Sequence, residues 1–300
     1  MTVKRSAYVA FALLGVIWGS NFIFMKWAVA WITPGQVVLL RVLFGFVPLL
    51  VYALMRGALH WRDLRHAPHF LVMALLATAL YYYAFAQGAA LLPSSVAGML
   101  SGAIPLFTFL AAMLFLREER LNRRIALGIA LGFAGVLLIA KPWEMGQAGF
   151  DARGVAYMVL GSLSVGVSFV YARLFITRLR LTPLALSTYQ TGMALILIAL
   201  VTDLHGIDHI LQDSRAVAGV VLGLGLLGTG VAYMLYYFIV DRLGAVAASG
   251  VTYLPPIVAL GVGVVLVHEP VQMSDLIAVA AILIGVYVLQ RGRSARAAAA

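Results

Sequence analysis

Ten long apolar runs, separated by short charged breaks, dominate the chain. Each run is close to or above the roughly 20 residues that a helix needs to cross the hydrocarbon core of a bilayer. The runs do not alternate apolar and polar positions as membrane β-barrel strands do, so their backbone groups must bond within their own helix. The pattern therefore predicts an all-α integral membrane protein with helices over 7–29, 35–55, 67–92, 95–116, 124–141, 154–177, 183–202, 215–240, 245–267 and 273–290.

The composition agrees with this interpretation. Of the 300 residues, 63% are hydrophobic and only 11% are charged, whereas a soluble domain carries about a quarter charged residues. There is no cysteine, which excludes disulfides, thiolate metal sites and cysteine nucleophiles. Lys4 and Arg5 precede the first run as in a signal peptide, but the run continues for about 20 residues without a cleavage site, and we expect it to be a retained helix.

Positive charges are distributed unevenly between the two ends of these helices. If the N-terminus lies inside, lysines and arginines gather in the inner loops, and the outer side has only Lys141, Arg153 and Arg215. Cytoplasmic loops carry such an excess. We expect a multi-pass protein of the bacterial inner membrane with both termini in the cytoplasm. These loops explain the net charge of +10, so nucleic acid is not an expected partner.

The two halves of the sequence match after a shift of 150 residues. Near the start of each half the shift is 149, which places Thr33-Pro34 on Thr182-Pro183. Farther on, Tyr83 falls on Tyr233, Ala97 on Ala247, Pro105 on Pro255, Glu119 on Glu269 and Gly135-Val136 on Gly285-Val286. Each copy has five helices, an odd number, so the second copy must enter the membrane from the opposite side. We expect a first five-helix repeat over 1–145 and an inverted second repeat with a basic tail over 146–300, together forming one transport domain.

Prolines interrupt the matching fourth and ninth helices at Pro105 and at Pro255-Pro256. Proline removes a backbone hydrogen bond and bends a helix. Interruptions at corresponding positions of inverted repeats are typical of transporters that bind their substrate near the midplane. A simple packing kink is the alternative.

The motifs also resemble a known family. Trp18-Gly19-Ser20-Asn21-Phe22, followed by Lys26, resembles the first-helix motif of EamA-type carriers in the drug/metabolite transporter superfamily. The end of that family's repeat is similar to Pro105, Leu116-x-x-Glu119, Gly128, Gly132 and Gly135-Val136, and again to Pro255, Leu266-x-x-Glu269 and Gly285-Val286. The second copy departs from the pattern at its start, where Ser164 to Ser168 replace the Trp-Gly-Ser-Asn run.

This resemblance covers nearly the whole chain. It implies a ten-helix carrier, often an exporter, whose central cavity is lined by the first four helices of each half. The fifth and tenth helices would lie at the periphery. Within the family, the chain is similar to bacterial amino-acid exporters, particularly those for aromatic amino acids.

Polar and aromatic residues inside the spans are candidates for contacts with substrate. Asn21 must find a partner within the bundle or face a cavity, and Tyr83 and Gln87 share one helix face. A tyrosine suits an amphipathic cargo because it has an apolar ring and a polar tip. Headgroup contacts for the tyrosines, and backbone bonds for Ser101, remain the alternatives. The candidate set is Trp18, Ser20, Asn21, Tyr83, Gln87, Ser101, Pro105, Ser164, Ser168, Tyr233, Tyr237, Tyr253 and Pro255.

Two cations, Lys26 and Arg41, fall near the outer ends of the first two helices. Embedded charge indicates function, but such side chains can also reach the headgroups or form structural pairs. All eleven carboxylates fall in loops or at span ends, whereas exchange of protons for cationic drugs usually needs a buried carboxylate. A neutral or zwitterionic cargo fits better.

Other motifs carry less weight. Gly223-x-Gly225-x-x-Gly228 matches the dinucleotide fingerprint, but it lies inside an apolar run and not between a strand and a helix. Gly15-x-x-x-Gly19, Gly128-x-x-x-Gly132 and Gly219-x-x-x-Gly223 predict close helix packing. His205 and His209 have the spacing of metal ligands but lack a metalloprotease glutamate, and we expect neither a metal nor a cofactor.

The leading hypothesis is an exporter of amino acids, large apolar or aromatic ones foremost, that works by alternating access. A proton-coupled efflux carrier for drugs or other metabolites is the alternative. A membrane enzyme acting on a lipid-linked substrate is a remote one, because the clustered catalytic groups it needs are not visible. Expected partners are the small-molecule substrate and membrane lipid, and a monomer and a homodimer are both open.

Overall fold

The computed structural model describes residues 3–116, 122–141, 151–243 and 250–297. This part of the chain is helical without strands, and ten of its helices are long and apolar enough to cross a membrane. The predicted fold class and the ten predicted spans are confirmed. Large apolar side chains such as Leu114 and Leu200 are about four-fifths exposed on the outside of the bundle, as expected for a surface that faces lipid.

The first five spans form the first copy. They are α1 (Val3–Ala28); α2 (Pro34–Met55); a third span with a 3-10 turn (Trp61–His66), α3 (Ala67–Ala74), a π-helical segment (Leu75–Ala79) and α4 (Leu80–Leu91); a fourth span with α5 (Ser94–Ser101) and α6 (Ile104–Phe115); and α7 (Arg123–Ala140).

The last five spans form the second copy. They are a sixth span with α8 (Ala152–Tyr171), a π-helical segment (Ala172–Ile176) and a 3-10 turn (Thr177–Leu179); α9 (Pro183–Val201); an eighth span with α10 (Ser214–Ala218), a π-helical segment (Gly219–Val231) and α11 (Ala232–Leu243); a ninth span with a 3-10 turn (Gly250–Tyr253) and α13 (Leu254–Val267); and α14 (Met273–Ala297). A short 3-10 turn (Ile207–Gln212) precedes the eighth span.

The same local chemistry starts the second helix of each copy. Thr33 caps α2, where its hydroxyl accepts from the backbone N–H of Gln36 at 3.3 Å. Thr182 caps α9, where it accepts from Ala185 at 3.2 Å. A proline follows each threonine at the first helical position, where its missing N–H costs nothing. The repeat found in the sequence is therefore also a repeat of structure.

Helix geometry is interrupted at matching places in the two copies. The third span contains the π-helical segment Leu75–Ala79, and the eighth contains Gly219–Val231, which includes the residues 150 positions later. The fourth and ninth spans are interrupted before Pro105 and Pro255. Both prolines lie in the first turn of a new helical segment, which corrects the expectation of a bend within one continuous helix.

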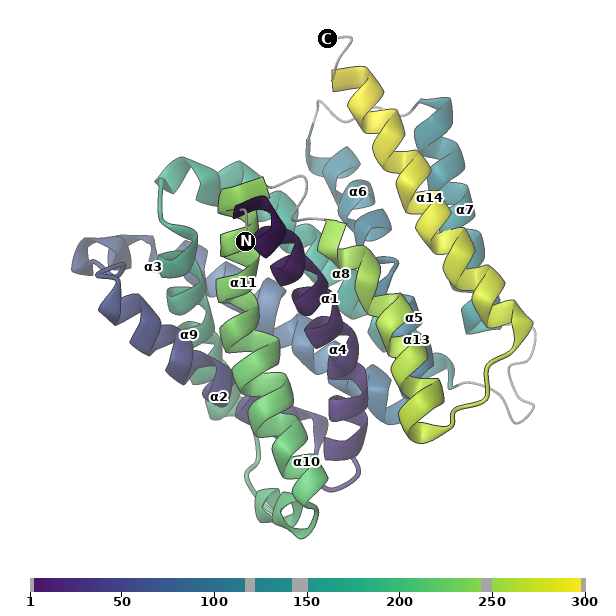
Figure 1. Ribbon diagram of the computed structural model, residues 1–300. Coiled ribbons are helices and arrows are strands. Elements are labelled where there is room, and N and C mark those ends of the chain that lie inside the picture. Colours follow the sequence, from purple (N-terminus) through teal and green to yellow (C-terminus); the bar gives the residue numbers. More distant parts are fainter. Residues whose placement is uncertain (1–2, 117–121, 142–150, 244–249, 298–300) are drawn as a thin grey trace.

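α7 and α14 lie side by side at one edge of the bundle (Figure 1), the peripheral position that the resemblance implies. Glycines let the two backbones touch. A Cβ atom on Gly285 would lie 2.5 Å from the backbone nitrogen of Gly132, and one on Gly128 would lie 2.5 Å from the carbonyl oxygen of Gly285. The predicted close packing at Gly128 and Gly132 is confirmed.

α1 contacts α4, α5, α11 and α13. Its Gly15 and Gly19 face Leu254 and Val258 of α13 so closely that neither position has room for a Cβ atom. The packing predicted from this glycine pair is confirmed, and the first helix of one copy is therefore locked against the fourth helix of the other.

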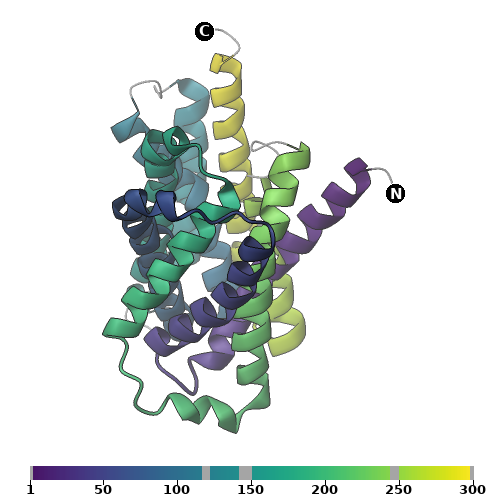
Figure 2. The same cartoon turned by 90° about the vertical axis from the view of Figure 1, so that its left-hand side faces the viewer.

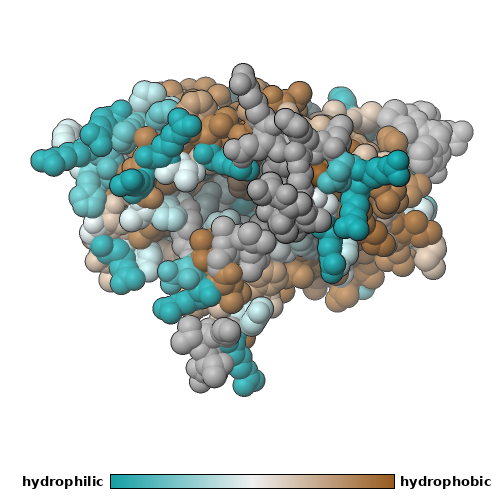
Figure 3. Space-filling model, turned by 90° about the horizontal axis from the view of Figure 1, so that it is seen from above, coloured by the Kyte–Doolittle hydropathy of each residue, from teal (hydrophilic) through white to brown (hydrophobic). Residues whose placement is uncertain are grey.

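The start of α1 and the end of α14 lie on the same side of the bundle (Figures 1 and 2), which we call the termini side. Figure 3 looks onto this side and shows several groups of hydrophilic side chains there. The loops that follow α1 and α13 lie on the opposite side, which we call the far side.

Candidate substrate site

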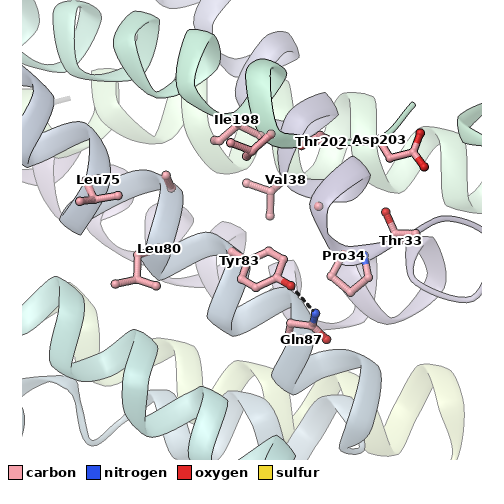
Figure 4. A pocket seen from close by; sticks show the side chains of 13 residues that line it. Thr33, Pro34, Val38, Leu75, Leu80, Tyr83, Gln87, Ile198, Thr202 and Asp203 are labelled. Atoms are coloured by element: carbon pink, nitrogen blue, oxygen red, sulfur yellow. Dashed lines mark hydrogen bonds between the residues drawn. The ribbon is translucent and has the colours of Figure 1, made fainter. Parts of the chain in front are cut away.

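A cavity of about 450 Å³ lies between α2, the third span and α9 on the far side. Figure 4 shows it lined by the start of α2, by Tyr83 and Gln87 of α4, and by the end of α9. The Gln87 amide donates to the Tyr83 hydroxyl at 2.8 Å, so the predicted shared face is confirmed. The cavity is of a size that binds small ligands, and a few polar groups are set in its mainly apolar wall.

Arg41 stands three residues after Val38, which lines the cavity, and is not itself among the lining residues. It is only 5% exposed. Arg41 therefore does not reach the lipid headgroups, which was one of the alternatives for the embedded cations. Its Nε donates to the Thr229 hydroxyl at 3.3 Å, and the guanidinium carbon lies 3.7 Å from the centre of the Tyr82 ring. With the Asn21 amide oriented to satisfy its hydrogen bonds, Oδ1 accepts from Arg41 Nη2 at 3.2 Å and Nδ2 donates to the Ile17 carbonyl at 3.1 Å.

A matching polar pair joins α9 to the third span. Gln190 lies 149 residues after Arg41, and its side-chain amide donates to the buried Thr78 hydroxyl at 2.8 Å. Thr78 belongs to the π-helical segment of the third span, and Thr229 to that of the eighth. In each copy, the second helix is therefore bonded to the π-helical segment of the other copy, with arginine in one pair and glutamine in the other.

The interrupted fourth and ninth spans touch each other. A Cβ atom on Gly102 would lie 2.9 Å from the Pro256 ring, and one on Gly98 would clash with the Ala259 methyl group. The two chain breaks therefore meet across the boundary between the copies, at small residues that leave the backbones in contact.

Among the candidates whose side chains the structure describes, only Tyr83 and Gln87 line the cavity. Trp18 packs at 6.2 Å against Tyr236, and Ser20, Tyr233 and Tyr253 are half-buried. The hydroxyls of Ser101 and Ser168 donate to backbone carbonyls within their own helices, and that of Ser164 donates to the Leu76 carbonyl at 2.7 Å. The side chain of Tyr237 lies outside the described part, as do Glu119 and Ala247.

Lys26 and Glu269 hold the turn between α4 and α5 on the far side. Lys26 Nζ donates to the carbonyl oxygens of Leu92 at 2.8 Å and Ala90 at 3.3 Å. Glu269 accepts from the backbone N–H and hydroxyl of Ser94 and from the N–H of Ser95, each at 2.8 Å. The cation thus caps a helix end and the anion a helix start, as helix dipoles favour. We call this arrangement the far-side clasp.

The clasp depends on a charged Glu269. Burial alone would raise the pKa of the Glu269 carboxyl, but hydrogen bonds from Ser95 and Ser94 outweigh that effect and hold the pKa below its usual range. Gly263 makes room for this carboxylate, since a Cβ atom there would lie 2.6 Å from Oε2. The clasp connects the copies, because Glu269 follows the ninth span and the turn follows the third.

The model of one protein family matches each of the two copies separately. The profile of the EamA-like transporter family matches residues 5–141 and again residues 152–291. The chain belongs to the EamA-like transporter family. It is a multi-pass membrane transporter whose two inverted five-helix repeats carry the cavity and the clasp described above.

Similar proteins align with nearly the whole of this chain, and their names state no transported molecule. An "Uncharacterized transporter" of Archaeoglobus fulgidus is 23% identical over 95% of this chain and 99% of its own. The "Uncharacterized inner membrane transporter YedA" of Escherichia coli K12 is 24% identical over 93% of this chain and 89% of its own. A solved structure described only as "Crystal structure of protein" has a TM-score of 0.59 and 24% identity over 95% of this chain and 96% of its own, which supports the fold.

Sequence reasoning missed Thr229, Thr78 and Gln190, and it did not anticipate the role of Glu269 on α5. The 149-residue shift pairs Arg41 with Gln190 and could have found that position. No sequence signal joins Glu269 to Ser94, because the two lie 175 residues apart and meet only in the folded bundle.

Proposed function

We propose that this protein exports small zwitterionic metabolites, foremost amino acids with large apolar or aromatic side chains, by alternating access. The observation that carries the proposal is the distribution of charge inside the spans. Each described carboxylate lies in a loop or within two residues of the end of a span. Exchange of protons for organic cations relies on acidic groups at bilayer depth, which the described spans do not supply.

The cavity supports an amphipathic cargo. Val38, Leu75, Leu80 and Ile198 give it apolar walls, and Tyr83 with its Gln87 partner offers a polar edge. An aromatic or branched side chain fits the apolar part of the cavity. We infer that Tyr83 and Gln87 contact the cargo, with Asn21 and Trp18 deeper in the bundle.

Alternating access is supported by the paired interruptions. Inverted repeats that meet at broken helices allow one copy to rock against the other around a site between them. Here the breaks meet at Gly102 and Pro256, and the clasp holds the far side together. We propose that the described conformation has its far side closed and that opening this side releases the clasp.

Localisation to the bacterial inner membrane with both termini in the cytoplasm is part of the same proposal. It rests on the excess of lysine and arginine on the inner side of the predicted topology. The outward direction of transport follows the resemblance to bacterial amino-acid exporters. A reporter fused after Ala300 should be active in the cytoplasm, and a periplasmic signal would refute the orientation.

Transport into liposomes tests the function. The purified full-length protein should move radiolabelled phenylalanine or leucine down a concentration gradient, and dissipating a proton gradient should leave the rate unchanged. Transport of none of the twenty amino acids would refute the cargo. Proton-dependent transport of cationic dyes would instead support the drug-efflux alternative.

A further inference from the structure

Arg41 is a cation at bilayer depth with neutral neighbours. It is 5% exposed, and its guanidinium contacts the Thr229 hydroxyl, the Asn21 amide and the Tyr82 ring. No carboxylate of the described residues pairs with it. An unpaired charge is costly in such surroundings, so a buried arginine without an acid indicates a ligand that supplies the negative charge.

The guanidinium has hydrogen-bonding capacity left over. Arginine carries five N–H donors, and the protein takes one at Nε through Thr229 and one at Nη2 through Asn21. In the described part of the chain, the remaining donors have no protein acceptor. A carboxylate is the natural partner, because its two oxygens accept a parallel pair of N–H groups from arginine.

The far-side cavity adjoins this group. Val38 lines the cavity and stands three residues before Arg41, which places the two on neighbouring positions of one helix face, about 4.5 Å apart along the axis. Tyr83 also lines the cavity, and the residue before it, Tyr82, carries the ring beneath the guanidinium. Along α2, Arg41 therefore lies about one helical turn from the part of the cavity wall that Val38 forms.

We propose that Arg41 binds the carboxylate of the transported molecule while the apolar remainder occupies the cavity beside Tyr83 and Gln87. This inference rests on the proposed function, because it assigns a contact to that cargo. It narrows the substrate class to small carboxylates with an apolar or aromatic remainder. Amines that lack a carboxyl group would be poor substrates.

The competing role for Arg41 is a purely structural one, in which it only ties α2 to the eighth span. The second copy shows what that role needs, because Gln190 makes the equivalent bond to Thr78 without a charge. Arg41→Gln therefore copies an arrangement that this fold already contains. The variant keeps a donor for Thr229 and removes the positive charge.

The experiment compares two ligands that differ only in the carboxyl group. Phenylalanine and phenylalaninamide compete against labelled phenylalanine in liposomes that contain the full-length protein. The wild type should prefer the acid by about 10-fold or more, the strength of hydrogen bonds to a charged group. Arg41→Gln should bring the ratio near one, Arg41→Lys should keep part of it, and Gln190→Leu, the matched position in the second copy, should leave it unchanged.

Equal competition by acid and amide in the wild type, or an unchanged ratio in Arg41→Gln, would overturn the inference and leave the proposed function standing. If no amino acid is transported, melting-temperature shifts with 3-phenylpropionate and 3-phenylpropionamide test Arg41 separately. Stabilisation by the acid alone, lost in Arg41→Gln, supports the site, and equal shifts refute it. If Arg41→Gln does not fold, the same comparison is made with the wild type and Arg41→Lys. Equal competition by acid and amide in the wild type, or an unchanged ratio in Arg41→Lys, then refutes the site.

Discussion

Replacing Glu269 by glutamine should release the far side of the carrier. The carboxylate accepts three hydrogen bonds of 2.8 Å from the start of α5 and attracts the Lys26 charge on the other flank of the turn. Glutamine keeps one acceptor oxygen but loses the charge and presents an amide donor to one of the N–H groups. Hydrogen bonds to a charged group contribute about 1.5–3 kcal/mol each, and partial exposure reduces that figure.

We therefore expect the closed far side to lose about 2 kcal/mol relative to the open one, which is roughly a 30-fold change in their ratio. The absence of cysteine from the chain makes this measurable. Val96 of α5 is 4% exposed, so a lone cysteine at Val96→Cys should react slowly with a maleimide in detergent. Adding Glu269→Gln should raise that reaction rate by up to about 30-fold.

Two controls separate opening of the far side from general effects. Asp213→Asn removes another far-side carboxylate, one that caps the start of α10 away from the clasp, and it should leave labelling at Val96→Cys unchanged. Ala53→Cys, buried in α2 toward the termini side, reports general loosening and should stay slow. If Glu269→Gln does not accelerate labelling at Val96→Cys, or accelerates both reporters equally, the clasp does not hold the far side closed.

Further predictions concern pH, packing and the polar pairs. The lowered pKa of Glu269 means that the clasp is fully stabilised above the usual glutamate pKa of about 4.3 and weakens as the pH falls through the lowered value. The labelling rate at Val96→Cys, divided by that of free cysteine at the same pH because maleimides react with the thiolate, should therefore be constant from pH 8 to about 5 and rise only in stronger acid. A rise of this ratio near pH 7 would contradict the reasoning. Gly285→Val should lower the melting temperature by forcing α7 and α14 apart at a cost of about 1–3 kcal/mol, whereas Gly261→Val, with open space around it, should not. Gln190→Leu should destabilise the protein by about 1 kcal/mol because it leaves the Thr78 hydroxyl without its donor, and a calorimetric double-mutant cycle with Thr78→Val should show coupling between the two.

The architecture could be predicted because hydrophobicity and internal repetition are local signals. Each span is visible as an apolar run. The start of the second helix of each copy is marked by the same Thr-Pro pair, at Thr33-Pro34 and at Thr182-Pro183. The prolines were interpreted as bends, but a proline is also well suited to the first turn of a helix, where no N–H is needed. The structure uses Pro105 and Pro255 in that second way.

The site was harder to predict because its contacts are distant in sequence. Arg41 and Thr229 are 188 residues apart, and an isolated arginine near a helix end gives no sign of which way its side chain turns. The π-helical segments also leave no hydrophobic pattern of their own. Tyr83 and Gln87 were predictable as a pair, since their spacing alone places them on one face.

The pairing of Arg41 with Thr229 and of Gln190 with Thr78 has a consequence for how such a carrier can be encoded. Two separate, identical five-helix chains inserted in opposite orientations would be related by strict two-fold symmetry, and each would bring the same residue to this position. Such a dimer would hold either two guanidinium groups or none. Joining the copies in one chain removes that constraint, so a single positive charge can stand on one side of the pseudo-axis and a neutral amide on the other.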